Sequence, residues 1–183
     1  MPHEVIAIIA IVGLLIIACD DNRDDNKVIT YAIGGTGPGG GIVFYDKGSV
    51  SDGWRYLEAA PTNQATSVAW SSTDVDVTGT GTAIGTGKAN TAAIIAAFSS
   101  DTASNNAAKV AVAYSGGGKN DWFFPSKDEL NEMYKAKTHL GISSGWFWSS
   151  SQYNFIYAWF QDFNYGSQDV DYRSNNVRAV RAF

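Results

Sequence analysis

The chain has 183 residues, a formal net charge of −5, an aromatic content of 13%, and 19 glycines against 4 prolines. This length accommodates one domain with a single core, and the aromatic content argues against a disordered chain. The acidic balance and the lack of any Lys/Arg cluster in the sequence argue against a nucleic-acid-binding protein, which needs a basic face for phosphates.

The N-terminus carries an apolar run from Val5 to Ala18 that is short for a membrane span and typical of a signal-peptide core. It ends in Ile16-Ile17-Ala18-Cys19, which resembles the lipobox of bacterial lipoproteins, where small residues precede the cysteine that receives the lipid. Cys19 is the only cysteine, so no disulfide can form within the chain. We therefore expect a lipoprotein signal peptide over residues 1–18 and lipidation of Cys19. An uncleaved N-terminal membrane helix is the alternative.

Residues 20–27 are all charged or polar and include no apolar side chain that could join a core. We expect residues 19–30 to comprise the lipidated cysteine and a solvated tether. Residues 31–183 then form a single domain outside the cytoplasm.

The domain begins with a glycine-rich stretch, Ile33–Gly41, followed by a predicted strand at Ile42–Tyr45. Phosphate-binding and dinucleotide-binding glycine loops instead precede a helix, so this order argues against a nucleotide site. The turn signal Asp52-Gly53 predicts a hairpin between the first strand and a second one at Trp54–Ala59.

The middle of the domain is predicted to contain a long loop and then helices. Ser71–Lys88 is rich in Thr, Gly, Ser and Asp; Asp74 and Asp76 could approach a calcium ion, but a solvated strand edge explains them better because the EF-hand pattern is missing. The helices are predicted at Asn90–Phe98, with Asn90 as its cap, within Ala103–Tyr114, and at Lys127–Lys137. Ser126 and Glu129 form a capping-box pattern for the third helix.

The last part of the chain is predicted to be a β meander. Its strand-prone segments are Trp146–Trp148, Tyr157–Phe160 and Val177–Phe183, separated by Gly, Asn and Ser. Strands at both ends with helices between them predict an α+β domain whose terminal strands meet in one sheet.

Several segments together resemble the Lcl C-terminal-type domain of bacterial surface lipoproteins, from Ile33 to the C-terminus. They are GPGGGIVFYDKG (Gly37–Gly48), DGWRYLEAAP (Asp52–Pro61), GTGKANT (Gly85–Thr91), DWFFPSKDELNEMY (Asp121–Tyr134), FWSSS (Phe147–Ser151) and VRAVRAF (Val177–Phe183). The resemblance implies a C-type-lectin-like fold with paired N- and C-terminal strands, two or three short helices and a loop-rich binding face. It also implies an outer-membrane location exposed at the cell surface. Adhesin-related members are associated with binding sulfated polysaccharides and with forming trimers. A site for sulfate groups needs converging Arg and Lys side chains, and this chain has one basic residue, Arg173, between Phe147 and Asn176.

The segment Tyr153–Asn176 has a paratope-like composition of aromatic, Asn, Asp and Ser residues. These types arise when the adenines of asparagine codons are randomised, so the segment resembles the variable region of diversity-generating retroelement targets such as treponemal variable lipoproteins. A binding surface that is not diversified is the alternative. Among the apparently fixed positions Ala158, Trp159, Gln161, Phe163 and Gly166, we expect Trp159 and Phe163 to be core residues. The resemblance implies a solvent-exposed recognition face made of Tyr153, Asn154, Phe155, Tyr157, Phe160, Asp162, Asn164, Tyr165, Ser167, Asp169, Asp171, Tyr172, Ser174 and Asn175.

The sequence offers little for catalysis. Its two histidines are His3 and His139, so the mature domain has no histidine pair for a metal and no triad, and we expect no metal and no cofactor. The carboxylate pairs Asp128–Glu129 and Asp169–Asp171 are interpreted as surface charges. We predict a protein that is not an enzyme, is anchored to the membrane by its lipid, binds a protein or glycan ligand but no nucleic acid, and is free to oligomerise. A structural envelope lipoprotein and a polysaccharide adhesin of fixed specificity are the alternatives.

Overall fold

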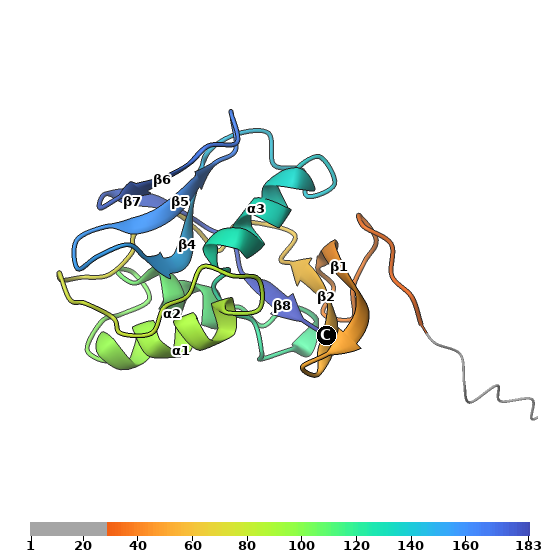
Figure 1. Cartoon of the computed structure of the whole chain (residues 1–183), viewed down its shortest axis with the longest axis horizontal. Coiled ribbons are helices and arrows are strands. Elements are labelled where there is room, and N and C mark those ends of the chain that lie inside the picture. The colour runs from red at the N-terminus through yellow and green to blue at the C-terminus, as the bar shows by residue number, and fades with distance from the viewer. Residues whose placement is uncertain (1–28) are drawn as a thin grey trace, which may run out of the picture. The chain divides into compact units, whose positions relative to one another are not determined.

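The computed structural model describes residues 29–183, and the predicted signal peptide and Cys19 lie outside the described residues. Tyr31–Phe183 forms one compact α+β unit with three α-helices and eight strands in two sheets (Figure 1). The predicted α+β class is confirmed. Within the part of the chain that the structure describes, no helix is both long and apolar enough to cross a membrane.

The smaller sheet joins the two ends of the domain. Asp52 and Gly53 have φ angles of 53° and 80°, the left-handed conformation that a two-residue hairpin turn requires, so the predicted hairpin is confirmed. Leu57 lies opposite Ala182, which confirms that strands from both ends of the domain pair. The antiparallel strands of this sheet, in spatial order, are β1 (Ile42–Ser51), β2 (Trp54–Ala59) and β8 (Val180–Ala182).

The larger sheet has five strands, and only β4 and β7 pair in parallel. The single strand predicted from Val177 to Phe183 is wrong, because Arg178 and Ala179 separate two strands that belong to different sheets. The buried Arg178 side chain donates hydrogen bonds to the backbone carbonyl oxygens of Ala60, Pro61 and Leu140. These bonds hold the chain in place where it passes from one sheet to the other. In spatial order the strands are β3 (Ala65–Ala69), β7 (Ser174–Val177), β4 (Trp146–Gln152), β5 (Ala158–Asp162) and β6 (Gln168–Asp171).

The three helices lie in the predicted regions, with one correction at a cap. Thr86, not Asn90, is the N-cap of the first helix, because the buried Asn90 side chain instead bonds Gly81 N at 2.8 Å, Gly81 O at 2.7 Å and Ser150 Oγ at 3.1 Å. The predicted capping box of Ser126 and Glu129 is confirmed. The helices are α1 (Gly87–Ala97), α2 (Ala107–Val112) and α3 (Lys127–Lys135), with a short 3-10 turn, η1 (Gly116–Gly118), after α2.

Two hydrophobic clusters form the core, and β4 contributes to both. Phe147 and Trp148 are adjacent and therefore point to opposite faces of the strand. Trp148 packs in the cluster that contains α1 and α2, whereas Phe147 packs in the cluster that contains α3 and the smaller sheet. Phe163 is fully buried, as predicted, but Trp159 is only half-buried and the expectation that it is a core residue is wrong.

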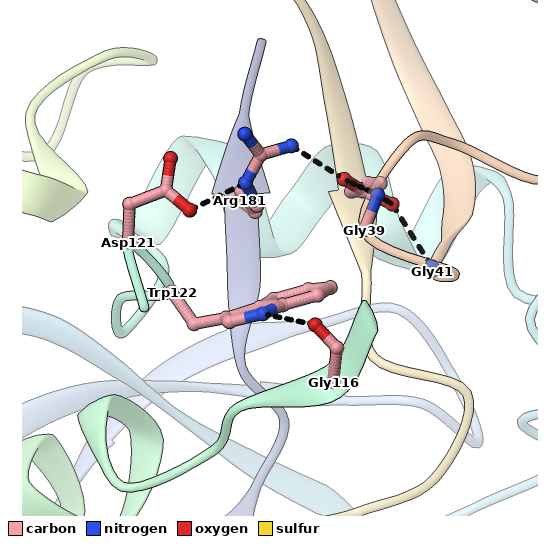
Figure 2. A network of polar contacts seen from close by, with 7 residues as sticks. Gly39, Gly41, Gly116, Asp121, Trp122 and Arg181 are labelled. Atoms are coloured by element: carbon pink, nitrogen blue, oxygen red, sulfur yellow. Dashed lines mark hydrogen bonds and ion pairs between the residues drawn. The ribbon is translucent and has the colours of Figure 1, made fainter. Parts of the chain in front are cut away.

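The glycine-rich stretch is fastened to the smaller sheet by the fully buried Glu58. Its carboxylate accepts hydrogen bonds from Gly39 N and Gly41 N, each at 2.9 Å, and from Arg181 Nη1 at 2.9 Å (Figure 2). A Cβ on Gly39 would lie 2.7 Å from Glu58 Oε1, so only glycine allows this approach. The loop therefore binds a side chain of its own domain in the way that other loops bind an anion.

Candidate functional site

The structure divides the fourteen predicted face residues into three groups. Three of them are half-buried: Asn154, Tyr157 and Phe160. Three others are buried, so the prediction that they are solvent-exposed is wrong: Asp162, Asp171 and Asn175. We refer to the eight exposed residues as the C-terminal face: Tyr153, Phe155, Asn164, Tyr165, Ser167, Asp169, Tyr172 and Ser174.

The two buried aspartates are occupied by their own turns. Asp162 Oδ1 accepts from Asn164 N at 2.7 Å and Asn164 Nδ2 at 2.6 Å. Asp171 Oδ1 accepts from Tyr172 N at 2.8 Å and from Arg173. Burial alone would raise the pKa of Asp162, but these hydrogen bonds outweigh it and the pKa is lowered. Both carboxylates thus shape the turns that present the face.

Two exposed tyrosines, Tyr153 and Tyr172, lie against neighbouring rings. Tyr153, 59% exposed, meets Trp159 edge to face at 5.5 Å between ring centroids, and Lys127 Nζ lies 4.0 Å from the centroid of the Trp159 ring. Tyr157 and Tyr172 form a second edge-to-face pair at 5.7 Å. Rings supported in this way offer contact area with little rotational entropy to lose on binding.

The loop between β4 and β5 is ordered by one amide. Asn154 Oδ1 accepts from Ile156 N and from Tyr157 N, both at 2.9 Å. This local turn leaves Phe155 and Ile156 exposed at the tip. The half-buried Asn154 therefore acts on the face through the backbone rather than as a contact residue.

A cavity of about 380 Å³ opens beside the C-terminal face, a size within the usual range of ligand pockets. None of its lining residues carries a charge. We refer to it as the Asn175 pocket, and it is lined by Ser67, Ser144, Gly145, Trp146, Asn164, Ser174, Asn175 and Asn176.

Asn175 is the unusual residue of this pocket. Its side chain is buried, and neither Oδ1 nor Nδ2 has a hydrogen-bond partner within the described part of the chain. Leaving a buried polar group unpaired costs about 1–3 kcal/mol, and most buried amides avoid it. Both atoms are closed off from solvent, so the Asn175 amide is an unpaired polar group inside the domain, next to the backbone that lines the pocket.

The backbone around the pocket departs from regular strand geometry. The pairing of β3 with β7 shifts register between Ala65 and Val68, and within this bulge Ser67 has a φ of 57°, which is rare for a residue other than glycine. Gly145, with a φ of 113°, leaves room for Asn176, whose Nδ2 would lie 2.9 Å from an added Cβ. Bulges and strained residues of this kind concentrate next to binding sites.

Sequence reasoning found only part of this pocket. Asn164, Ser174 and Asn175 belong to the predicted face, although Asn175 was expected at the surface. The remaining lining residues were missed. Trp146 was predicted only as part of a strand, and nothing in the sequence marks Ser67, because the bulge depends on pairing with a strand more than one hundred residues later. The missed residues are Ser67, Ser144, Gly145, Trp146 and Asn176.

The proposed carboxylate pairs do not form open acid sites. Glu129 is fully buried and accepts from Ser126 N at 2.7 Å and Gly85 N at 2.8 Å; burial raises its pKa. This contradicts its interpretation as a surface charge. Among residues 29–183 no three His, Cys, Asp or Glu side chains gather closely enough to hold a metal ion, and Asp74 and Asp76 are exposed.

No protein-family model and no curated protein matches the chain. The resemblance to the Lcl C-terminal-type domain and to retroelement targets therefore stays a prediction.

Proposed function

We propose that this chain is a lipid-anchored binding module, displayed on the bacterial surface, that recognises a protein or glycan ligand through the C-terminal face and the Asn175 pocket. The exposed aromatic side chains of the C-terminal face, which lie beside an open cavity, are the observation that carries the proposal.

The exposed aromatic residues support the same function. Tyr165 is 88% exposed and Tyr172 is 62% exposed, on a domain whose other aromatic side chains are mostly buried or half-buried. Exposed aromatic side chains close together are typical of interaction surfaces. A structural envelope protein has no need of them. Because each carboxylate pair considered for catalysis has one member engaged in a cap or a turn, Glu129 and Asp171, we do not propose an enzyme.

The experiment is a binding screen with the full chain, purified in detergent and applied to arrays of glycans and peptides. The triple variant Tyr153→Ala, Tyr165→Ala, Tyr172→Ala should lose the ligand that the wild type retains. Val50→Ala is the matched control, because Val50 is 73% exposed on β1, outside the face. Undiminished binding by the triple variant would refute the proposed face.

The lipid anchor is tested separately. Cells expressing the chain with Cys19→Ser should lose incorporation of a labelled fatty acid and release the protein from the membrane fraction. Retention of the label in the Cys19→Ser variant would contradict lipidation at this residue.

One observation favours diversification of the exposed positions. Three of the five apparently fixed residues, Ala158, Gln161 and Phe163, are buried, while eight of the fourteen predicted variable residues are exposed. Sequencing the 3′ end of the gene from many clonal isolates should show substitutions at codons of the C-terminal face that trace to adenines. An invariant segment would instead support a fixed ligand.

A further inference from the structure

We infer that the loop between β4 and β5 inserts its tip, residues 153–157, into the lipid surface of a second membrane, which faces the membrane that holds the N-terminal anchor. This inference goes beyond the proposed binding function, although the choice of a second membrane rests on the proposed anchor. Three features of the tip carry it: its exposed apolar side chains, its internally bonded backbone and the charges around it.

Two adjacent apolar side chains protrude from the tip. Phe155 is 54% exposed and Ile156 is 39% exposed, so both face water in the free protein. Insertion into lipid would remove them from water together, and the strength of such binding rises with the apolar area that is buried. Exposed apolar side chains that lie together mark contacts with proteins or membranes. The remaining features decide between these two partners.

Tyrosine rings flank the apolar tip. Tyr153 is 59% exposed, and Tyr172 is 62% exposed with its ring centroid 5.7 Å from that of Tyr157. Tyrosine and tryptophan gather where lipid headgroups meet hydrocarbon, because the ring is apolar and its polar group needs water. Apolar side chains at the tip with tyrosines on either side therefore match the order of layers in one leaflet.

The backbone of the tip is bonded within the loop itself. Tyr153 N and Asn154 N donate to Tyr157 O at 2.9 Å and 3.1 Å. Ile156 N and Tyr157 N donate to Asn154 Oδ1, both at 2.9 Å. A backbone N–H group without a partner is costly in an apolar medium, so segments that enter lipid satisfy these groups internally. The tip can therefore leave water without breaking any of these four bonds.

The tip brings no isolated charge with it. Residues 153–160 contain no Asp, Glu, Lys or Arg. Asp171 lies opposite Ala158, the residue that follows the tip, but it is buried and pairs with Arg173 at 3.1 Å from Nε to Oδ1. An unpaired charge would oppose insertion into an apolar layer. The carboxylate beside the tip is therefore already neutralised.

Basic groups lie beside the tip, where lipid headgroups would be. The Arg173 side chain is 69% exposed, and Lys127 Nζ lies 4.0 Å from the centroid of the Trp159 ring. Lipid phosphates attract basic side chains at this level. The exposed Asp169 lies opposite Phe160, farther along β5 from the tip. The charges near the tip thus favour a phosphate-bearing surface.

The start of the tether favours a second membrane over the anchoring one. Tyr31, the first residue of the compact unit, packs against Tyr56 of β2 at 5.4 Å and against Phe183 at 5.0 Å between ring centroids. In Figure 1 the smaller sheet and the orange segment that contains Tyr31 lie on the right of the domain, whereas the loop between β4 and β5 lies on the left. The tip is therefore remote from the point where the tether joins the domain.

A groove on a protein is the alternative partner of the tip. Protein interfaces combine apolar anchors with hydrogen bonds. Four N–H groups of the tip and the amide oxygen of Asn154 are already used within the loop, so the tip offers chiefly apolar surface. This favours lipid.

The test uses the full chain, reconstituted through its N-terminus into phosphatidylcholine vesicles. A supported bilayer of phosphatidylcholine and phosphatidylglycerol should capture these vesicles above the level of empty ones. The double variant Phe155→Ser, Ile156→Ser should lower capture about tenfold, the effect of losing one to two buried apolar side chains. Phe155→Leu should retain most of it. Val50→Ser is the matched control and should retain all of it, because Val50 is 73% exposed on β1.

Fluorescence identifies which membrane the tip enters. The signal of Phe155→Trp, corrected for that of the wild type, should be quenched by brominated lipid placed in protein-free vesicles. Brominated lipid placed only in the vesicles that carry the chain should leave it unquenched. Val50→Trp should not respond to the protein-free vesicles.

Each outcome supports or overturns the inference. Capture that survives the double serine variant overturns it, as does quenching only from the anchoring membrane. If no lipid surface captures the chain but the array screen finds a ligand, the inference fails and the proposed function stands; loss of that ligand in the double serine variant would assign the tip to a protein or glycan. If the screen is also empty, both fail. Asn154→Ala, which keeps both apolar side chains but frees two amides, should also lower capture. Thermal unfolding checks that each variant is folded.

Discussion

Arg181 Nη1 lies 2.9 Å from Glu58 Oε1, so a buried ion pair ties the last strand of the domain to β2 beside it. The Glu58 carboxylate also holds the glycine-rich loop. The Arg181 guanidinium also donates through Nε to Asp121, two residues before Phe123, which pairs with Val180. Segments separated by more than a hundred residues therefore meet at one buried carboxylate.

Removing that carboxylate should be costly. Glu58→Ala leaves Arg181 Nη1 and two loop amides without their partner, and deletion of one member of a buried pair typically costs about 3–5 kcal/mol. Denaturant unfolding of the full chain measures the loss. Lys135→Ala is the control, because Lys135 pairs with Glu132 at the surface of α3 and such pairs contribute about 1 kcal/mol or less. Equal losses in the two variants would show that Glu58 does not organise the fold.

Asn175→Leu should stabilise the protein. Leucine has a similar shape and removes two unpaired buried polar groups, so we expect a gain of about 1–3 kcal/mol in the free energy of unfolding. The comparison is Asn106→Leu, in which a buried amide loses its bonds to Asp101 and Lys109 and stability should fall. A stability loss for Asn175→Leu would mean that its amide has partners in the free protein.

Asp101 should make the folding stability of the domain sensitive to acid. Burial acts to raise the pKa of Asp101, but hydrogen bonds from Ser72 and Asn106 lower it overall. A lowered folded-state pKa gives stability that is present above the unfolded pKa of about 4 and is lost as pH falls through the folded pKa. Asp101→Asn should therefore lose less stability than the wild type between about pH 6 and about pH 3. Unfolding curves across this pH range measure the difference. Asp74→Asn, at an exposed position in the loop before α1, is the control and should behave as the wild type.

Arg178 should not tolerate lysine. Its guanidinium donates to the carbonyl oxygens of Ala60, Pro61 and Leu140, and burial lowers the pKa of Arg178 to about 10. Lysine cannot reach three separate carbonyls with the same geometry, so Arg178→Lys should cost about 2–3 kcal/mol. Thermal unfolding measures the loss. Arg173→Lys, at an exposed turn, should change the melting temperature little, and the same small effect at both positions would contradict the bridging role.

Local patterns predicted several elements because the deciding interactions lie within a few residues. Ser126 and Glu129 satisfy each other's backbone amides, so the start of α3 could be located from four residues. Asp52-Gly53 predicted the hairpin for the same reason, since the turn conformation depends on those two residues. Phe163 was correctly placed in the core, but Trp159 was not, because a large aromatic side chain can equally support an exposed ring.

Where a polar residue lies was harder to predict than where a helix begins. Asp162 and Asp171 have the composition of a binding surface, yet each folds back on its own turn. Asn90 has the composition of a cap, yet it bonds a loop nine residues earlier. The partner that a short polar side chain selects depends on which donors the rest of the fold brings near it.

The sequence by itself determined the α+β class, the hairpin, the capping box of α3 and the pairing of the two ends of the domain. Tertiary structure alone decided that Glu58 holds the glycine loop, that the last segment divides between two sheets, and that Ser67, Trp146 and Asn175 enclose one pocket. The physical reason is distance along the chain: the first group depends on patterns and turns that are local, or on the pairing of whole hydrophobic strands. The second depends on individual polar atoms that meet only when segments remote in sequence pack together.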